Sequence, residues 1–440
     1  MTRVPGEKEP GEHPLTRLQR ELQEEDGVIK DLQPIARALK RNMSSAVWES
    51  VPDPRNARGR RHTLSSVLKQ LTLGLLTHQR TLRDVERLGT RAPAMRELGV
   101  RSAPSDSTMD RILRTISPEG LRPLVHEQVK AMRRNKQLER AIDFPYDLVA
   151  VDGKAVGTDK VQLHPESHRV TTKGQAPRFV LKSIRAVHVS SAVRPVLDQK
   201  LQPAQRGERV GLEAFLLGLR ATYGSLVQCL SFDAGFWSLH LAIWLSSLFI
   251  PYIFALKGNA GSAFTFAHKE LGDETREPPT GWEAEVIERV GSRIVRRQIA
   301  RVKTDLGTCG AIAQAWRQRT RVEVKGELVS EDNRYFVTNI PLTALTPQQA
   351  LAAVRAHWGI ENDSNWTMDV ILDEDSSAWV RQATAREALT WLRIFAYNIL
   401  RLLRMRTRRG ERESLLPWRE VLDEVTDTVL GRRIETTGFS

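Results

Sequence analysis

Three acidic residues that lie far apart in the sequence could together hold divalent metal ions. Asp152 and Asp233 each follow a short apolar run, residues 148–151 and 226–232, of the kind that forms a buried strand. Glu361 instead lies in a segment whose apolar residues recur at roughly helical spacing. A carboxylate on such a segment should be paired, bonded to a metal or shifted in pKa. Two strand-end aspartates and one helical glutamate form a set that can hold metal ions for phosphoryl transfer.

Each of these carboxylates also has a simpler interpretation. Asp152-Gly153 and Asp233-Ala234-Gly235 have the composition of turns that follow strands, which is the usual role of Asp-Gly. Glu361 could cap its helix or pair with Arg355 on the same helix. Taken singly, the turn interpretation is favoured for both aspartates. Taken together with the order of the strands around them, the three residues favour a metal site.

The segment from 146 to 259 is predicted to form the first part of an α/β core. Its apolar runs predict five strands and two helices, at 148–151, 184–189, 195–201, 226–232 and 252–256 for the strands and at 208–219 and 238–248 for the helices. Three strands, a helix, a strand, a helix and a strand is the order of a ribonuclease H-like fold. This order places the two aspartates at the ends of the first and fourth strands.

A β-rich insertion is predicted from 260 to 343. Residues 283–290 and 293–302 alternate polar and apolar side chains around Gly291-Ser292, which indicates a hairpin, and further strands are predicted at 319–324 and 334–338. The Arg-rich polar face of this segment could lie against phosphates, although arginines on a solvated strand face are commoner.

Helical pattern returns after the insertion. Thr346-Pro347 supplies an N-cap and a first helical position, and the helix is expected to continue through Glu361. A long helix is predicted at 385–405, so residues 344–408 complete the core. Residues 409–440 are predicted to be a C-terminal tail.

The N-terminal part is predicted to be helical. Residues 1–40 are interpreted as a charged arm that is mobile or partly helical. Within 41–145, the apolar positions of 64–88 predict two helices broken near Thr77, and Ser105-Asp106-Ser107-Thr108 predicts a helix start. Short helices in a basic setting are compatible with a helix-turn-helix DNA reader. The signal is not specific, because small helical bundles are common and most do not bind DNA.

The charge balance favours a polyanionic partner. The chain of 440 residues carries 66 Lys or Arg against 53 Asp or Glu, a net charge of +13. Nucleic acid is the first candidate partner and an anionic membrane surface the second. The alternative is a general bias towards arginine.

Three further features bear on the location of the protein. Cys229 and Cys309 are too few for a disulfide framework or a cysteine zinc cluster, and both are expected to be neutral thiols. The longest apolar run, 239–256, is divided by Pro251 and is better explained by a core helix and a core strand than by a membrane span. The polar N-terminal residues have no apolar core of a secretory signal. A cytoplasmic protein without a membrane partner is therefore predicted.

Three blocks of this sequence resemble the catalytic motifs of one known family. They are Val149-Ala150-Val151-Asp152-Gly153-Lys154, Ser231-Phe232-Asp233-Ala234 and Arg355-Ala356-His357-Trp358-Gly359-Ile360-Glu361-Asn362. The family is the ISAs-type insertion-sequence transposases, also called H-repeat-associated proteins, within the DDE transposase group. The resemblance extends from about Val51 to Arg404. Supporting matches are Arg58-Gly59-Arg60-Arg61-His62, Ser107-Thr108-Met109-Asp110-Arg111, Gly291-Ser292-Arg293-Ile294 and Asp373-Glu374-Asp375.

The resemblance implies metal-dependent DNA cleavage and strand transfer, in which an insertion sequence moves by cut-and-paste transposition. Two Mg²⁺ ions, replaceable by Mn²⁺, are expected, with Asp152 bridging both, Asp233 holding one and Glu361 the other. The expected partner is double-stranded DNA, both the element ends and the target, bound by a homodimer. The location would be a bacterial cytoplasm, on the nucleoid when bound to DNA. The residues expected to contact DNA are Arg60, Arg61, Lys154, Arg293, Arg355 and His357.

The sequence departs from the family pattern at three positions. The family usually has an arginine where this chain has Gly157, a histidine where it has Phe236, and another histidine where it has Asn365. All three catalytic carboxylates are nevertheless present. Two alternatives therefore stand beside an active transposase: a decayed or domesticated transposase that only binds DNA, and a ribonuclease H-like nuclease that cuts without strand transfer.

Overall fold

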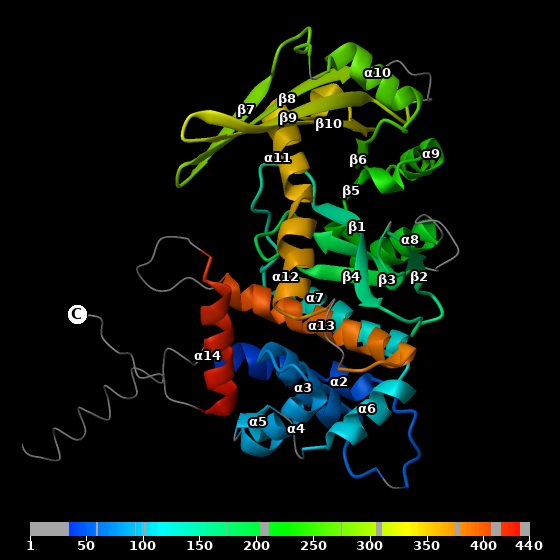
Figure 1. Cartoon of the computed structure of the whole chain (residues 1–440), viewed down its shortest axis with the longest axis vertical. Coiled ribbons are helices and arrows are strands. Elements are labelled where there is room, and N and C mark those ends of the chain that lie inside the picture. The colour runs from blue at the N-terminus through cyan, green and yellow to red at the C-terminus, as the bar shows by residue number, and fades with distance from the viewer. Residues whose placement is uncertain are drawn as a thin grey trace, which may run out of the picture.

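A mixed α/β architecture is built around one long sheet (Figure 1). The computed structural model describes residues 35–431, apart from 59, 93, 99, 101–102, 173, 203–210, 274, 305–309, 375–378 and 406–414. Within these residues ten strands share the sheet in the order β2-β3-β1-β5-β6-β10-β9-β8-β7, and β4 pairs with β3. The strands are β1 (Leu148–Asp159), β2 (His168–Val170), β3 (Arg178–His188), β4 (Val196–Leu201), β5 (Cys229–Phe232), β6 (Tyr252–Leu256), β7 (Ala284–Val290), β8 (Arg293–Lys303), β9 (Gln314–Val324) and β10 (Glu327–Thr338).

The half of the sheet that carries the two aspartates contains both antiparallel and parallel strand pairs. β1 is antiparallel to β3, β3 is antiparallel to β4, and β1, β5 and β6 run parallel to one another. The residues of β1 from Leu148 to Val151 are all fully buried, as expected for a strand covered on both faces. The strands predicted at 148–151, 195–201, 226–232 and 252–256 are thus confirmed, and the one predicted at 184–189 is the C-terminal half of β3.

The predicted turn at Asp152-Gly153 is wrong. β1 continues to Asp159, because its ladder with β3 extends through Asp152, which pairs with Arg185, and Gly153, which pairs with Ile184. The ladder is interrupted only by a bulge between Ala155 and Gly157. Asp152 is therefore fixed by strand pairing on its N- and C-terminal sides rather than by the end of a strand.

The predicted insertion joins the same sheet. β7 and β8 form the hairpin predicted around Gly291, which has the positive φ of 61° that favours glycine. β9 and β10 are longer than the sequence predicted, and α10 (Ser262–Leu271) precedes them. β10 pairs antiparallel with β6, with Val337 opposite Phe254. Residues 284–338 therefore extend the sheet of the core.

Helices after the insertion connect the two ends of the molecule. α11 (Pro347–His357) begins with the capping box of Thr346 and Gln349, as the sequence predicted for its N-terminus. α11 descends from the β7–β10 region towards α12 (Trp366–Val370) (Figure 1). α13 (Ala383–Arg404) is buried along most of its length and contacts β4 on one side and the N-terminal helices on the other.

The N-terminal helices pack against α13 (Figure 1). The predicted break near Thr77 and the predicted helix start at Ser105 are confirmed, since Thr77 caps one helix and the side chain of Ser105 accepts a hydrogen bond from the Thr108 N–H. The helices are α2 (Val47–Ser50), α3 (Leu64–Leu76), α4 (Leu82–Arg91), α5 (Ala94–Glu97), α6 (Asp106–Thr115) and α7 (Arg122–Arg134).

The boundaries predicted for the two terminal segments need correction. Residues 35–43 are helical and bury Ile35 and Leu39, so the packed part of the chain begins before the predicted arm boundary at 40; residues 1–34 lie outside the described part. The predicted tail contains α14 (Trp418–Leu430), which buries an apolar stripe against α13, α3 and α5. Residues 409–414 and 432–440 lie outside the described part. Burial of apolar residues at helical spacing explains both corrections.

The remaining predictions about apolar segments are also resolved. α9 (Leu239–Ser247) and β6 lie on the two sides of Pro251, as predicted for a core helix and a core strand. In the part of the chain that the structure describes, none of the helices has the length and hydropathy of a membrane span. Cys229 is a buried free thiol, whereas Cys309 lies outside the described residues. The helix predicted at 208–219 is observed as α8 (Leu212–Tyr223), and its first predicted residues, like Cys309, lie outside the described residues.

Candidate active site

Strand pairing brings the two aspartates together. β1 and β5 run parallel, and Val151 of β1 lies opposite Phe232 of β5. Asp152 directly follows Val151, and Asp233 directly follows Phe232. Because neighbouring strands lie about 4.8 Å apart, the two carboxylates are held at the same edge of the β1–β5 ladder. Their convergence follows from the register of this one pair of strands.

Glu361 reaches the same region from a π-helical turn. The α-helix expected to run through Glu361 ends as α11 at His357, and residues Ile360–Asn365 form a π-helix in contact with β1. In this turn Ile360 and Ser364 are buried, whereas Glu361 is exposed. Single π-helical turns are rare and are frequent at functional sites.

The three carboxylates interact electrostatically. Burial, together with the negative charges of Glu361 and Asp233, raises the pKa of Asp152 to about 7. Glu361 is exposed as a residue, but its carboxyl is partly shielded from water, and this shielding and the charge of Asp233 raise its pKa, although the charges of Arg334 and Lys257 oppose the shift. The ammonium of Lys257 lies 3.7 Å from a carboxylate oxygen of Asp233. The structure therefore concentrates negative charge at this edge of the sheet.

We expect Asp152→Asn to stabilise the protein in the absence of divalent ions, by an amount that grows as the pH rises from about 4 to about 7 and is constant above that. The neutral Asp152 carboxyl contributes stability that is fully present below about pH 4 and is lost as the pH rises through the folded-state pKa of about 7. An amide keeps the neutral state at every pH. The gain should therefore be absent at pH 4 and reach about 1–4 kcal/mol at pH 8.

The measurement is the midpoint of urea unfolding in EDTA at pH 4, 6 and 8. Asp423→Asn, which changes a largely exposed carboxylate on α14, is the control and should shift the midpoint little at any of these pH values. A gain for Asp152→Asn that is equal at pH 4 and pH 8 would contradict the electrostatic origin.

A cleft opens beside two of the carboxylates. Its volume is about 870 Å³, and its lining includes Asp233, Glu361, Lys257, Arg334 and Trp358. The guanidinium of Arg334 lies 3.8 Å from the centre of the Trp358 ring, a cation–π contact that joins β10 to the end of α11. Two cations thus stand next to two carboxylates at the wall of an open cleft.

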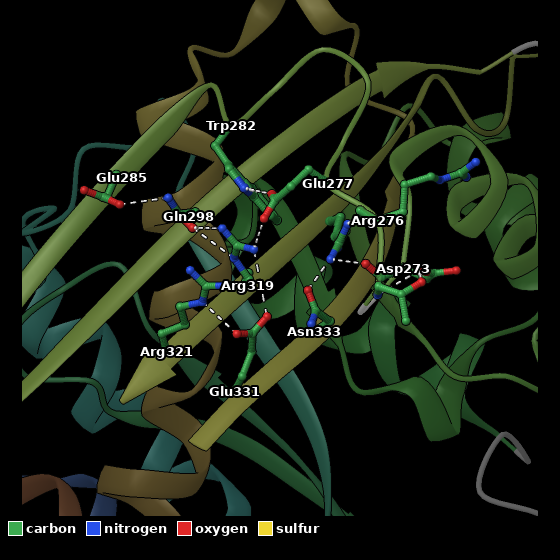
Figure 2. Close-up of polar contacts among 12 residues, drawn as sticks. Asp273, Arg276, Glu277, Trp282, Glu285, Gln298, Arg319, Arg321, Glu331 and Asn333 are labelled. Carbon is green, nitrogen blue, oxygen red and sulfur yellow. Dashed lines mark hydrogen bonds and ion pairs between the residues drawn. The ribbon is translucent and has the colours of Figure 1, made fainter. Parts of the chain in front are cut away.

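Buried arginines of β9 bind the segment that follows α10 (Figure 2). Arg317 of β9 donates to the backbone carbonyls of Leu271, Asp273 and Arg276, which fixes the chain after α10. Arg319 donates to Glu277 and Gln298, and the Trp282 ring covers its guanidinium at 4.4 Å. The Arg-rich face predicted for the insertion therefore consists partly of internal structural arginines.

Two residues predicted to contact DNA are inside the fold. The ammonium of Lys154 is buried and lies 2.6 Å from a carboxylate oxygen of Asp369. His357 is buried and shares a hydrogen bond of 2.9 Å with the hydroxyl of Ser231. Burial lowers the pKa of His357 to about 4, so its ring is neutral at pH 7. Each of the two side chains is buried and has a protein partner.

The other four residues predicted to contact DNA lie at or near the surface. Arg61 and Arg293 are exposed, and Arg60 donates to the carbonyl of Arg55 at 2.9 Å. Arg355 pairs with Glu288 of β7 rather than with Glu361. Contact of these four side chains with DNA stays a prediction.

The three departures from the family pattern have definite structural roles. The side-chain amide of Asn365 donates to Asp152 at 3.2 Å, a contact that the sequence did not predict. Phe236 is buried beside Phe232, with ring centres 6.2 Å apart. A Cβ at Gly157 would lie 3.0 Å from a guanidinium nitrogen of Arg386, so a cation from α13 already occupies that space. Only the polar character of Asn365 could have marked it in the sequence.

A buried network of ion pairs joins β1 and β3 to Glu374. Glu374 is fully buried and pairs with the buried Arg185 of β3. Lys154 lies 3.8 Å from Glu374 and completes the network. Burial alone would raise the pKa of Glu374, but the charges of Arg185 and Lys154 bring it below its usual value. The network includes Lys154, which follows Asp152 on β1, and Arg185, which pairs with Asp152 in the β1–β3 ladder.

Comparison with known proteins identifies the family. A family model described as "Transposase DDE domain" matches residues 143–399, more than half of the chain, and one described as "DDE_Tnp_1-associated" matches residues 46–127. The chain therefore belongs to the DDE transposase family of insertion sequences. Members of this family are enzymes that cut DNA, and their DDE domains generally use divalent metal ions.

Individual relatives agree with this assignment. YbfL of Escherichia coli K12 is 21% identical over 364 residues, which cover 80% of this chain and 88% of YbfL. The H repeat-associated protein YhhI of the same strain is 36% identical over 67 residues, covering 15% of this chain and 17% of YhhI. YncI of E. coli O157:H7 is 34% identical over 68 residues, covering 16% of each chain. YhhI and YncI are both named as transposases, but the chain spans less than a fifth of either.

One solved structure is also similar. A cryo-EM structure of the piggyBac transposase synaptic complex with hairpin DNA aligns with 92% of this chain and 80% of that chain, with 12% sequence identity and a TM-score of 0.40.

Proposed function

We propose that this chain moves an insertion sequence by cutting DNA and joining the freed ends to a target, with divalent ions held by Asp152, Asp233 and Glu361. The observation that carries the proposal is the pairing of Val151 with Phe232, which aligns the two aspartates, together with the charge interaction of both aspartates with Glu361. The strand order β4-β3-β1-β5-β6, three antiparallel strands followed by two parallel ones, supports a ribonuclease H-like core.

The donor set fits divalent ions in its chemistry and its electrostatics. Three carboxylates lie in one region, and burial together with the charges of Glu361 and Asp233 raises the pKa of Asp152, so a bound cation would be favoured there. Mg²⁺ is usually bound by one or two carboxylates, with water and substrate phosphates completing its coordination. Within the described residues no group of three or more His, Cys, Asp or Glu side chains is placed to hold one ion. Asp152, Asp233 and Glu361 are the residues that would hold the ions, with water and substrate phosphates as the remaining ligands.

When bound there, two Mg²⁺ ions would activate the attacking oxygen and stabilise the leaving oxygen of a phosphodiester. The residues of the chain have separate tasks. Lys257 and Arg334 place positive charge at the wall of the cleft, where a DNA phosphate could be bound. The neutral ring of His357 holds Ser231, two residues before Asp233, and so fixes the end of β5. No covalent intermediate with the protein is needed, so no nucleophilic side chain is assigned.

Double-stranded DNA, both the element ends and the target, is the proposed partner. The net charge of +13 and the exposed Arg61 and Arg293 support contacts with the phosphate backbone. Two copies of the chain would be needed to hold two element ends, so a homodimer on DNA is proposed. We place this activity in the cytoplasm, on the nucleoid.

The test uses the purified full-length protein and a duplex that carries the inverted repeats flanking its gene. With Mg²⁺ or Mn²⁺ we expect cut element ends, and joined products when target DNA is added; with EDTA we expect neither. Cleavage without joining would identify a nuclease. Binding of the duplex without cleavage would identify a domesticated DNA-binding protein, and either result would overturn the proposal.

A further inference from the structure

One π-helical turn carries Glu361 and also contacts Asp152. The turn Ile360–Asn365 carries Glu361 at its beginning, and its last residue, Asn365, donates its side-chain N–H to Asp152 Oδ2 at 3.2 Å. The other oxygen of Asp152 accepts the backbone N–H of Gly153 at 2.7 Å. Each carboxylate oxygen of Asp152 therefore has one donor, which fixes its orientation and leaves further lone pairs on both oxygens for another partner.

The turn is also anchored on its other side. Asp363 pairs with Arg194, and it lies 3.6 Å from a guanidinium nitrogen of the buried Arg401 on α13. Gly359 allows this arrangement, since a Cβ at that position would lie 2.9 Å from a guanidinium nitrogen of Arg194. A turn held by Asp363 on one side and by Asn365 on the other cannot shift Glu361 without breaking one of these contacts.

The amide of Asn365 has a second unusual property. Its N–H group is used by Asp152, but its Oδ1 atom is buried and has no hydrogen-bond partner among the described residues. A buried acceptor without a partner destabilises the folded protein, so such groups usually mark a ligand or a role. Rotating the amide would turn this oxygen towards the Asp152 carboxylate, where the two oxygens repel. An ion held by Asp152 would carry bound water, and an O–H group of that water could donate a hydrogen bond to Asn365 Oδ1.

We propose that Asn365 is a positioning residue for the divalent ions: its amide fixes the Asp152 carboxylate relative to Glu361, which the same π-helical turn carries. This inference rests on the proposed function, since it requires that Asp152 and Glu361 hold the ions. Hydrogen-bond partners that orient metal ligands change metal affinity by about 10–100-fold when they are removed. A residue that only stabilised the fold would leave metal affinity unchanged.

The experiment measures Mn²⁺ binding to the full-length protein by calorimetry in the absence of DNA. Asn365→Ala should raise the dissociation constant by about 10–100-fold. Asn365→His, which keeps an N–H donor, should restore most of the affinity. Asn135→Ala, the same substitution at an exposed position on the C-terminal end of α7, should bind like the wild type. Asn365→Leu fills a similar volume without a donor, and it replaces Asn365→Ala if that variant does not fold.

Two failures are distinguishable in this experiment. If the wild type binds Mn²⁺ and Asp152→Asn does not, but the Asn365 variants bind like the wild type, the positioning role is wrong and the proposed metal site stands. The same conclusion follows if Asn365→Ala only lowers the unfolding midpoint. If the wild type does not bind Mn²⁺, or Asp152→Asn binds equally well, the proposed metal site itself fails, and the role of Asn365 fails with it.

Discussion

Replacing Asp152, Asp233 or Glu361 singly by its amide, as Asp152→Asn, Asp233→Asn or Glu361→Gln, should lower the rate of DNA cleavage by about 10³-fold or more. A divalent ion stabilises the transition state of phosphoryl transfer by several kcal/mol, and each 1.4 kcal/mol corresponds to about tenfold in rate. DNA binding should change by less than about threefold, because affinity comes mainly from contacts to backbone phosphates. The measurements are single-turnover cleavage in Mg²⁺ and gel-shift binding in EDTA with the same duplex.

The amides are chosen because they keep the size of each side chain and remove only its charge. Asp423→Asn, an exposed aspartate on α14, is the matched control and should cleave like the wild type. Loss of binding in parallel with loss of cleavage would mean that the carboxylates support the fold or the DNA contact rather than the chemistry. Persistent cleavage by Asp152→Asn would exclude this residue from the site.

The second large effect is expected on stability, from Glu374→Gln. Glu374 and its partner Arg185 are both fully buried, and the ammonium of Lys154 lies 3.8 Å from the same carboxylate. Removing the negative charge leaves a buried guanidinium without compensation, which should lower the free energy of unfolding by about 3–5 kcal/mol. The measurement is the urea midpoint at pH 7.

Glu285→Gln provides the comparison for this stability prediction. Glu285 pairs with Arg296 at 2.7 Å on the surface of the β7–β8 hairpin, where both side chains are about one-third exposed. An exposed pair of this kind contributes about 0–1 kcal/mol. Equal effects of the two substitutions would show that the network around Glu374 is no more important than a surface ion pair.

Local sequence patterns were sufficient for two elements whose signals lie within a single turn of chain. Thr346-Pro347 predicted the start of α11 because capping and the missing N–H of proline act within one turn. Gly291 predicted the β7–β8 hairpin because a turn with positive φ depends on the residue itself. The family membership likewise follows from motifs of a few residues around Asp152, Asp233 and Glu361.

Some errors in the sequence interpretation arose where distant segments meet. Asp152-Gly153 has the composition of a turn, but pairing with β3 keeps both residues in the strand. The predicted C-terminal tail contains α14, because its apolar stripe finds α13 and α3, which lie far away along the chain. Neither outcome can be obtained from local propensity, since long-range pairing and burial override it.

By itself the sequence determined which residues could do the chemistry, since carboxylates of this kind after apolar runs and on a helical segment are a local property of the chain. Only the tertiary structure decided how they are arranged. The register that sets Val151 against Phe232, the π-helical turn that carries Glu361 and Asn365, and the burial of Lys154 and His357 all depend on contacts between segments remote in sequence. Such contacts form because packing and strand pairing lower the free energy of the whole fold. This free energy cannot be deduced from a short stretch of the sequence.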